Sequence, residues 1–158
     1  MKKYEFTGET KRVELWNRTA TLHRIKATVE FGFVKVGELG GWIEKEENLS
    51  HEGKAWVCGD AEVWGNAKVW GNAEVCGDAE VFLASHVLVM GSVGSRNDFT
   101  TFFRDKDNEI TVKCGCFLGK IDKFLEKVTQ THGNNKYALV YRAAVEVAKL
   151  QIELTERK

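Results

Sequence analysis

The chain has 158 residues, with 23 basic and 23 acidic side chains and a formal net charge of zero at pH 7. This length favours one domain, or one domain with a small addition, and the charge balance lacks the cluster of cations that extended nucleic-acid binding needs. No apolar run approaches the roughly 18 to 20 residues of a membrane span, and no signal-peptide core follows Met1. We therefore expect a cytoplasmic protein that binds no membrane.

Residues 1–36 carry the first strand signals. Tyr4 and Phe6, followed by Val13 and Leu15, indicate a hairpin around Gly8. Apolar and polar residues then alternate in the segment 22–31, which is typical of a half-buried strand. We expect this unit to be a β cap that covers the open end of the next unit, because an uncapped sheet edge invites association.

Residues 37–94 are built on a period of six. The chain has 15 glycines and no proline, and five of the glycines each open a hexad that reads Gly-x-Ala-x-Val-x, at 53, 59, 65, 71 and 77. Valine recurs at every sixth position from Val57 to Val93. A step of six residues rotates an α-helix by about 240°, so a helix would scatter these valines around its surface. Short strands joined by turns would keep them all inward.

These hexads resemble those of the hexapeptide-repeat proteins, although glycine stands two residues after the aliphatic position instead of one. Val36 to Ser50, together with the repeats, also resembles uncharacterised hexapeptide-repeat proteins of phages and prophages. The resemblance implies a left-handed parallel β-helix of about three coils, with 18 residues in each coil. It also implies a homo-oligomer, either a trimer or a dimer.

A coil of 18 residues would place Trp64 under Phe82 and Trp70 under Leu88 on the outside of the β-helix. Two such apolar ridges predict a subunit interface, with coverage by the flanking segments as the alternative. Cys58 would lie under Cys76, where filling of a turn is the expected role and a disulfide is geometrically possible. Four cysteines are too few for a disulfide scaffold.

Residues 95–158 differ in composition, with 12 cations and nine anions against two and five in residues 53–94. Segments 99–104 and 110–117 predict a β-hairpin, and helical spacing follows from about residue 120 to 131 and again after Gly133. The expected fold is therefore mainly β, with a C-terminal ββαα unit that serves oligomerisation or binding.

Histidine and cysteine supply the candidate chemistry. In hexapeptide acyltransferases a histidine is the general base, so His86 and His51 are the candidates if this chain is an enzyme; a solvated surface histidine is the alternative. Cys114, Cys116 and His132 could hold a metal ion, but a structural zinc site needs four ligands. Packing is the alternative for these cysteines, and we expect no cofactor or metal.

A dense polar run, with Arg96, Asn97, Asp98 and then Arg104, lies where the repeats give way to the C-terminal unit. Arginine suits a phosphate or carboxylate, so the run predicts a site for a small anionic ligand. The alternative is a linker whose Asn and Asp stabilise a turn.

The leading functional hypothesis is a non-enzymatic accessory binding protein of phage or prophage type, which recognises a host protein or a small anionic ligand. Inhibition of a host defence system is a role that only the resemblance implies. The two alternatives are a hexapeptide-repeat acyltransferase and a structural module of a viral or cell-surface assembly.

Overall fold

The computed structural model describes residues 2–15 and 18–154. The N-terminal part contains three strands: β1 (Tyr4–Leu15), β2 (Arg18–Ala27) and β3 (Leu39–Ile43). Four strands of two residues each follow: β4 (Trp56–Val57), β5 (Glu62–Val63), β6 (Glu74–Val75) and β7 (Glu80–Val81). The C-terminal part contains four strands and two helices: β8 (Val87–Val93), β9 (Asp98–Arg104), β10 (Ile110–Cys114), β11 (Phe117–Lys120), α1 (Ile121–His132) and α2 (Lys136–Gln151).

The strands form three separate sheets, and the predicted left-handed parallel β-helix is wrong. One sheet is mixed, in the order β1-β2-β3-β5-β7, because the β1-β2-β3 pairings are antiparallel while the β3-β5-β7 pairings are parallel. A second sheet holds only the parallel pair β4-β6, and a third is antiparallel, in the order β11-β10-β9-β8. None of the three, among the described residues, closes into a solenoid.

The physical reason for this difference lies at the two ends of the repeats. Register partners 18 residues apart do occur, since Glu62 pairs with Glu80 and Trp56 with Glu74. Each of these ladders is only two residues long, however, and longer strands take over on both sides. Strand β2 pairs antiparallel with β3, and β8 leaves the repeat register to pair antiparallel with β9.

The repeat glycines make the turns between the short strands. All five have φ between +62° and +69°, a left-handed conformation that glycine adopts without steric cost. A Cβ atom at Gly53 would also lie 2.7 Å from the carbonyl oxygen of Gly71. The glycine period therefore reflects both the left-handed turns and the close approach of successive repeats.

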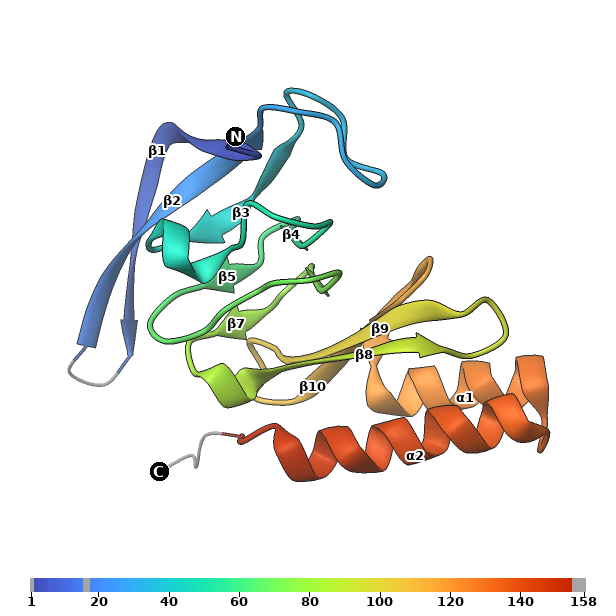
Figure 1. The fold of residues 1–158 in the computed structure, drawn as a ribbon. Helices are drawn as coiled ribbons and strands as arrows, with labels where there is room; N and C mark the ends of the chain where they lie inside the picture. Colours follow the sequence, from blue (N-terminus) through green and yellow to red (C-terminus); the bar gives the residue numbers. More distant parts are fainter. Residues whose placement is uncertain (1, 16–17, 155–158) are drawn as a thin grey trace.

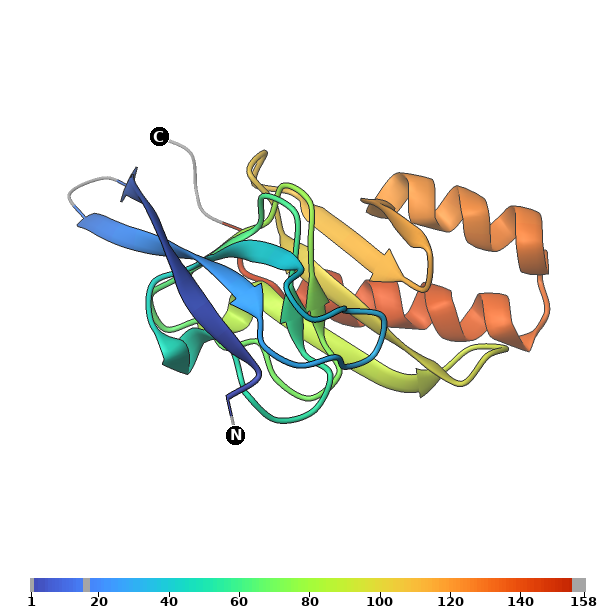
Figure 2. The ribbon, with the colours of Figure 1, turned by 90° about the horizontal axis from the view of Figure 1, so that it is seen from above.

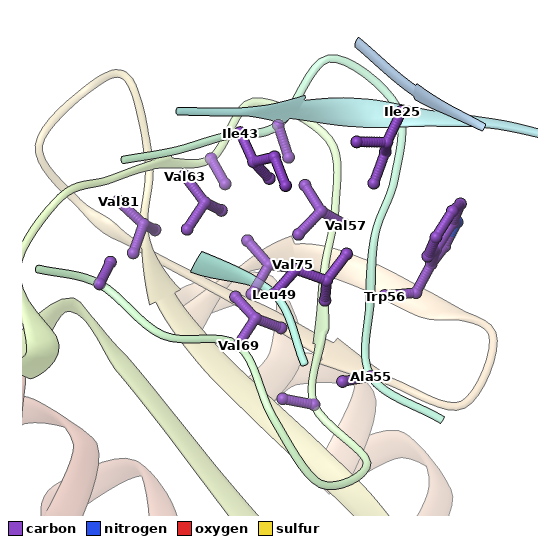
Figure 3. Packing of buried hydrophobic residues seen from close by; sticks show 14 of the residues in the cluster. Ile25, Ile43, Leu49, Ala55, Trp56, Val57, Val63, Val69, Val75 and Val81 are labelled. Atoms are coloured by element: carbon purple, nitrogen blue, oxygen red, sulfur yellow. The ribbon is translucent and has the colours of Figure 1, made fainter. Parts of the chain in front are cut away.

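The valines of the repeats point into a common core, as Figure 3 shows. All five repeat valines from Val57 to Val81 are fully buried, as are the alanines two positions before them. Ile25, Ile43 and Leu49 from the preceding segments complete this core. The inward orientation predicted from the spacing is confirmed, although the sheets around it differ from the expected ones.

The four-stranded sheet lies between the repeats and the two helices (Figures 1 and 2). Phe103 on β9 is fully buried in the repeat core, whereas its neighbour Phe102 packs into a second core with the helices. Successive residues of a strand face opposite sides of its sheet, so β9 contributes to both cores. Neither α1 nor α2 is long and apolar enough to cross a membrane.

The N-terminal hairpin differs from its prediction in the position of its turn. Strand β1 runs without a break from Tyr4 to Leu15, and its register with β2 shifts between Phe6 and Thr10. Gly8, with φ of +96°, lies in this irregularity, so the residue that predicted a turn makes a bulge. The hairpin turn instead follows Leu15.

The helical boundaries follow the sequence closely. Helix α1 ends at a Gly133 cap with φ of +60°, and the Asn135 side chain accepts hydrogen bonds from the backbone N–H groups of Tyr137 and Ala138 at the start of α2. Such caps satisfy backbone groups that a helix end leaves without partners. The division into units 1–36, 37–94 and 95–158 stays a prediction, and β8 of the second unit pairs with β9 of the third.

Candidate functional site

The polar run predicted to bind an anion is divided between the two ends of β9. Arg96, Asn97 and Asp98 are exposed at the turn between β8 and β9. Arg104 lies at the other end of β9 and is buried. An extended strand of seven residues separates them by about 20 Å, so the structure does not bring the four residues into one site.

Arg104 is held by groups of the protein itself. Its Nη1 donates a hydrogen bond of 2.8 Å to the carbonyl oxygen of Glu80 and lies 3.6 Å from the Glu80 carboxylate, and its Nε donates to Asn108. The guanidinium also lies over the Phe82 ring. These contacts join β9 to β7, which is a structural role.

The four residues predicted at an interface have different surroundings. The Trp64 and Phe82 rings stack with their centroids 4.7 Å apart and are buried with Ala20, Leu22 and Trp42. The β1-β2 hairpin therefore covers this ridge. Trp70 is 64% exposed, whereas Leu88 on β8 packs against the helix core, so these two do not form a second ridge.

A shallow depression lies beside the covered ridge. It has a volume of about 260 Å³ and is lined by Val13, Glu14, Glu62, Trp64, Glu80 and Phe82. Burial, and then the neighbouring Glu62, raise the pKa of Glu80. Two of the three carboxylates are paired, because Glu62 contacts Lys11 and Glu80 contacts Arg104. The depression therefore has little excess negative charge with which to hold a cation.

His86, the first candidate for a general base, is fully buried. Its Nδ1 accepts hydrogen bonds from the backbone N–H groups of Phe82 and Leu83 at 3.1 and 3.2 Å, and its ring meets the Phe82 ring edge-on. Burial, and then the positive charge of Arg104, lower the pKa of His86 to about 4. This histidine orders the turn after β7 and is shielded from solvent.

We expect this burial to make stability depend on pH between about 6.5 and about 4. In the unfolded chain His86 binds a proton below its ordinary pKa of 6.5, whereas the folded protein resists protonation until about 4. The free energy of unfolding should therefore be highest above pH 6.5 and fall by up to about 3 kcal/mol towards pH 4. Urea unfolding at several pH values measures this loss.

His86→Gln is the matched variant, because its side-chain oxygen can accept a hydrogen bond but does not titrate. Its unfolding free energy should change less with pH over the same interval. Equal slopes for the two proteins would show that other groups cause the dependence.

His51, the second candidate, also uses both ring nitrogens within the protein. Its Nδ1 accepts from the backbone N–H of Lys3 at 3.0 Å, and its Nε2 lies 2.9 Å from the Glu46 carboxylate. The ring stacks on Tyr4. Because Nδ1 is the acceptor, Nε2 carries the hydrogen and donates to Glu46. In this arrangement neither nitrogen is available to take a proton from a substrate.

The candidate metal ligands meet a tyrosine that the sequence assigned only to the core. Tyr141 lies within hydrogen-bonding reach of the Cys114 thiol and stacks on His132 with the ring centroids 5.9 Å apart. Cys114 also accepts from the Thr100 hydroxyl, whereas Cys116 is exposed in the β10-β11 turn. Among residues 2–15 and 18–154, no three His, Cys, Asp or Glu side chains are grouped closely enough to hold a metal ion.

Burial raises the pKa of Tyr141 to about 12, and the nearby Cys114 and Asp98 add to the increase while Arg96 opposes it. The Tyr141 hydroxyl fits against Gly94, where any Cβ atom would collide with it. Two of the predicted groups, the β8-β9 turn and Cys114 with His132, thus converge on one buried tyrosine. A helical stripe that included Tyr141 gave no signal of this polar neighbourhood.

The other cysteine pair is joined. Cys58 and Cys76 form a disulfide between successive repeats, with a Cα–Cα distance of 4.5 Å. This pairing is the alternative that the 18-residue spacing left open. The cross-link lies in the repeats, away from Cys114 and Cys116, which are free.

The most exposed aromatic residue lies in a segment that sequence analysis treated only as the approach to the first repeat. Residues 28–38, here called the Phe33 loop, connect β2 to β3. Phe33 is 95% exposed and Val36 is 65% exposed, and Leu39 follows at the start of β3. Figure 1 shows this loop at the upper right, on the opposite side of the molecule from α2.

Hydrogen bonds fix the backbone of the Phe33 loop. Phe31 and Val34 exchange both of their backbone hydrogen bonds, and both ends of the loop bond to Ala27, through Gly37 N–H and Glu38 C=O. Beneath the loop, the Lys3 ammonium lies over the Phe31 ring and donates to the carbonyl oxygen of Ala55. An ordered loop therefore presents two apolar side chains to solvent. Gly32 and Gly37 on either side of Phe33 were the only sequence signal.

The chain was also compared with known proteins. No protein-family model matches its sequence, and no curated protein matches it.

Proposed function

We propose that this chain is a non-enzymatic binding protein that recognises a partner protein through the Phe33 loop. The observation that carries the proposal is the 95% exposure of Phe33 on a loop with a hydrogen-bonded backbone. An exposed aromatic side chain costs solvation free energy in the isolated protein and gains it on burial in a partner. The loop thus has the properties of an anchor for a protein interface.

Order in the loop strengthens the proposal. Binding loses less conformational entropy when the contacting segment is already fixed, and aromatic anchors supply much of the free energy of many interfaces. Val36 and Leu39, which flank Phe33 along the chain, are also exposed. The partner should therefore offer an apolar pocket that receives the Phe33 ring, with a shallower apolar rim for the other two.

Two observations favour this proposal over its alternatives. The ring nitrogens of His51, and Nδ1 of the fully buried His86, already make hydrogen bonds within the protein, which weakens the acyltransferase alternative. Arg96 and Arg104 lie at opposite ends of β9, which favours a protein over a small anion as the partner. The likeness to phage sequences points to a host protein, and inhibition of a defence system would be one consequence of binding it.

The test compares Phe33→Asp with Trp70→Asp. Both replace an exposed aromatic residue, so neither should alter the fold, but only the first removes the anchor. Affinity capture from a lysate of the source cells should retain one protein on the wild type and on Trp70→Asp, and lose it on Phe33→Asp. With the purified partner, loss of such an anchor should raise Kd by roughly 30-fold, equivalent to about 2 kcal/mol.

Hydrogen exchange should then locate the contact. Amides in residues 28–39 should gain protection in the purified complex, and those around Trp70 should not. Equal binding by the Phe33→Asp variant, or protection elsewhere, would contradict the proposal. So would turnover of acetyl-CoA by the wild-type protein, because that result would establish an acyltransferase.

A further inference from the structure

Helix α2 is apolar on two opposite sides. Its inner side is buried against the sheet and α1 through Ala138, Tyr141, Ala144, Val145 and Ala148. Its outer side carries Val140, Ala143, Val147 and Leu150, all of them exposed, and Leu150 is 88% exposed. We call these four residues the outer stripe. A helix that is apolar all round is normally buried on all sides, so the outer stripe lacks the cover that its composition calls for.

Helix α1 provides an internal comparison. It buries Ile121, Phe124 and Val128 and turns charged residues outward, including Lys123 and Glu126, which pair at 3.5 Å. Every residue of α1 is described, and none of its large apolar side chains is exposed. Both helices cover the same face of the four-stranded sheet (Figure 1). The exposed apolar side chains are therefore a property of α2 and not of the helical layer.

The spacing of the outer stripe identifies the geometry of its partner. Successive members lie three, four and three residues apart, which is the a/d pattern with which one helix packs against another in a coiled coil. An isolated helix with so short a pattern would be marginal in water. Here the inner face of α2 already holds the helix in place, so a second helix needs only to dock.

We propose that the outer stripe of α2 packs antiparallel against the same stripe of a second copy, which forms a two-fold dimer. Small residues fill the first half of the stripe and larger ones the second half. Antiparallel pairing places Val147 against Ala143 of the second copy, and Leu150 against Val140 of the second copy. Large side chains thus meet smaller ones, as close packing requires, and the same patch serves both copies, as a two-fold interface requires.

Charge permits this association. The net charge of zero removes the general repulsion between copies. Glu146 lies near the expected two-fold axis, but its carboxylate is 3.6 Å from the Lys149 ammonium of the same helix, so the axis does not bring together two uncompensated carboxylates. The antiparallel arrangement also opposes the two helix dipoles favourably.

The size of the stripe sets the expected strength. A helix of 16 residues is about 24 Å long, and one face of it is smaller than the roughly 800 Å² per partner of a standard stable interface. We therefore expect a weak dimer, in exchange with the monomer at micromolar concentrations. Neighbouring apolar residues at Leu139 and Leu154, both exposed, would extend the contact beyond the stripe.

Sedimentation velocity on the full chain, over a concentration series from about 1 to about 500 µM, brackets a micromolar Kd. The mass should rise from 17.9 kDa towards twice that value. Leu150→Glu should raise the dimer Kd by at least about 30-fold and leave the melting temperature of the monomer unchanged, because this side chain contributes little to the folded monomer. Phe33→Glu, on the opposite side of the molecule, is the matched control and should dimerise like the wild type.

A cross-linking experiment tests the direction of the helices. In a Cys116→Ser background, oxidation of the double variant Ala143→Cys with Val147→Cys should give a dimer linked between positions 143 and 147. A monomer throughout the series, a dimer that survives Leu150→Glu, or a 143-to-143 link would overturn the proposal. Because the stripe and the Phe33 loop are separate surfaces, Leu150→Glu should still bind the partner protein, so failure of one proposal leaves the other intact.

Discussion

Replacing Phe103 with alanine is expected to lower the free energy of unfolding by about 3 to 5 kcal/mol, the usual cost of emptying a buried phenylalanine site. Phe103 is fully buried and places its ring from the C-terminal sheet among the repeat valines. The cavity would open at the contact between the two parts of the molecule. Urea unfolding followed by circular dichroism and by tryptophan fluorescence measures the loss.

Coincidence of the two signals decides how the parts of the chain are coupled. Fluorescence reports mainly on the repeats and hairpin, because Trp42, Trp56, Trp64 and Trp70 lie there, whereas the two helices dominate the circular dichroism. We expect both signals to shift together in Phe103→Ala. Phe33→Ala is the exposed control and should change the free energy by less than about 0.5 kcal/mol. Separate transitions, with only one of them shifted, would instead support independent units on either side of residue 94.

The second large effect is expected at Asp105, whose carboxylate is buried in the turn between β9 and β10. It accepts hydrogen bonds from the backbone N–H groups of Asp107 and Glu109 and from the Thr111 hydroxyl, and it lies 2.9 Å from the Lys120 ammonium. Asp105→Ala would leave these donors without an acceptor and should cost about 3 to 5 kcal/mol. Thermal and urea denaturation test this value.

Two further variants separate the carboxylate's charge from its position. Asp105→Asn keeps one oxygen acceptor but removes the charge, so its loss should be intermediate. Glu109→Ala removes an exposed carboxylate 3.7 Å from the same ammonium and should cost less than about 1 kcal/mol. If Asp105→Ala cost no more than Glu109→Ala, the buried hydrogen bonds would not be what holds this turn.

Lys120 shows why this turn is strongly coupled to the start of α1. Burial lowers the pKa of its ammonium, but hydrogen bonds to Asp107 and Asp105 and the charges of Asp105 and Glu109 outweigh that effect and raise it. The ammonium thus stays charged throughout the physiological range. Since Lys120 immediately precedes α1, the Asp105 network orders both the β9-β10 turn and the beginning of the helix.

The functional residues were harder to predict than the elements that carry them. Trp64 and Phe82 stack as the 18-residue spacing predicts, but the hairpin that covers them is distant in sequence. Leu88 keeps the place of a repeat residue in the sequence and yet lies in a strand that pairs with β9. Phe33 drew no attention, because exposure is set by what fails to pack against a residue, and no local pattern records that.

The sequence by itself determined the local structure: the valines face inward because they recur every six residues, the glycines make left-handed turns, and the helices end at Gly133 and begin again after Asn135. Only the tertiary structure decided which strands pair, because register partners in two-residue ladders gain too few hydrogen bonds to exclude longer antiparallel neighbours. The zero net charge at the outset likewise acquired a more specific meaning. It permits two copies to approach, but the side chains that would meet are defined only by which face of α2 the sheet leaves uncovered.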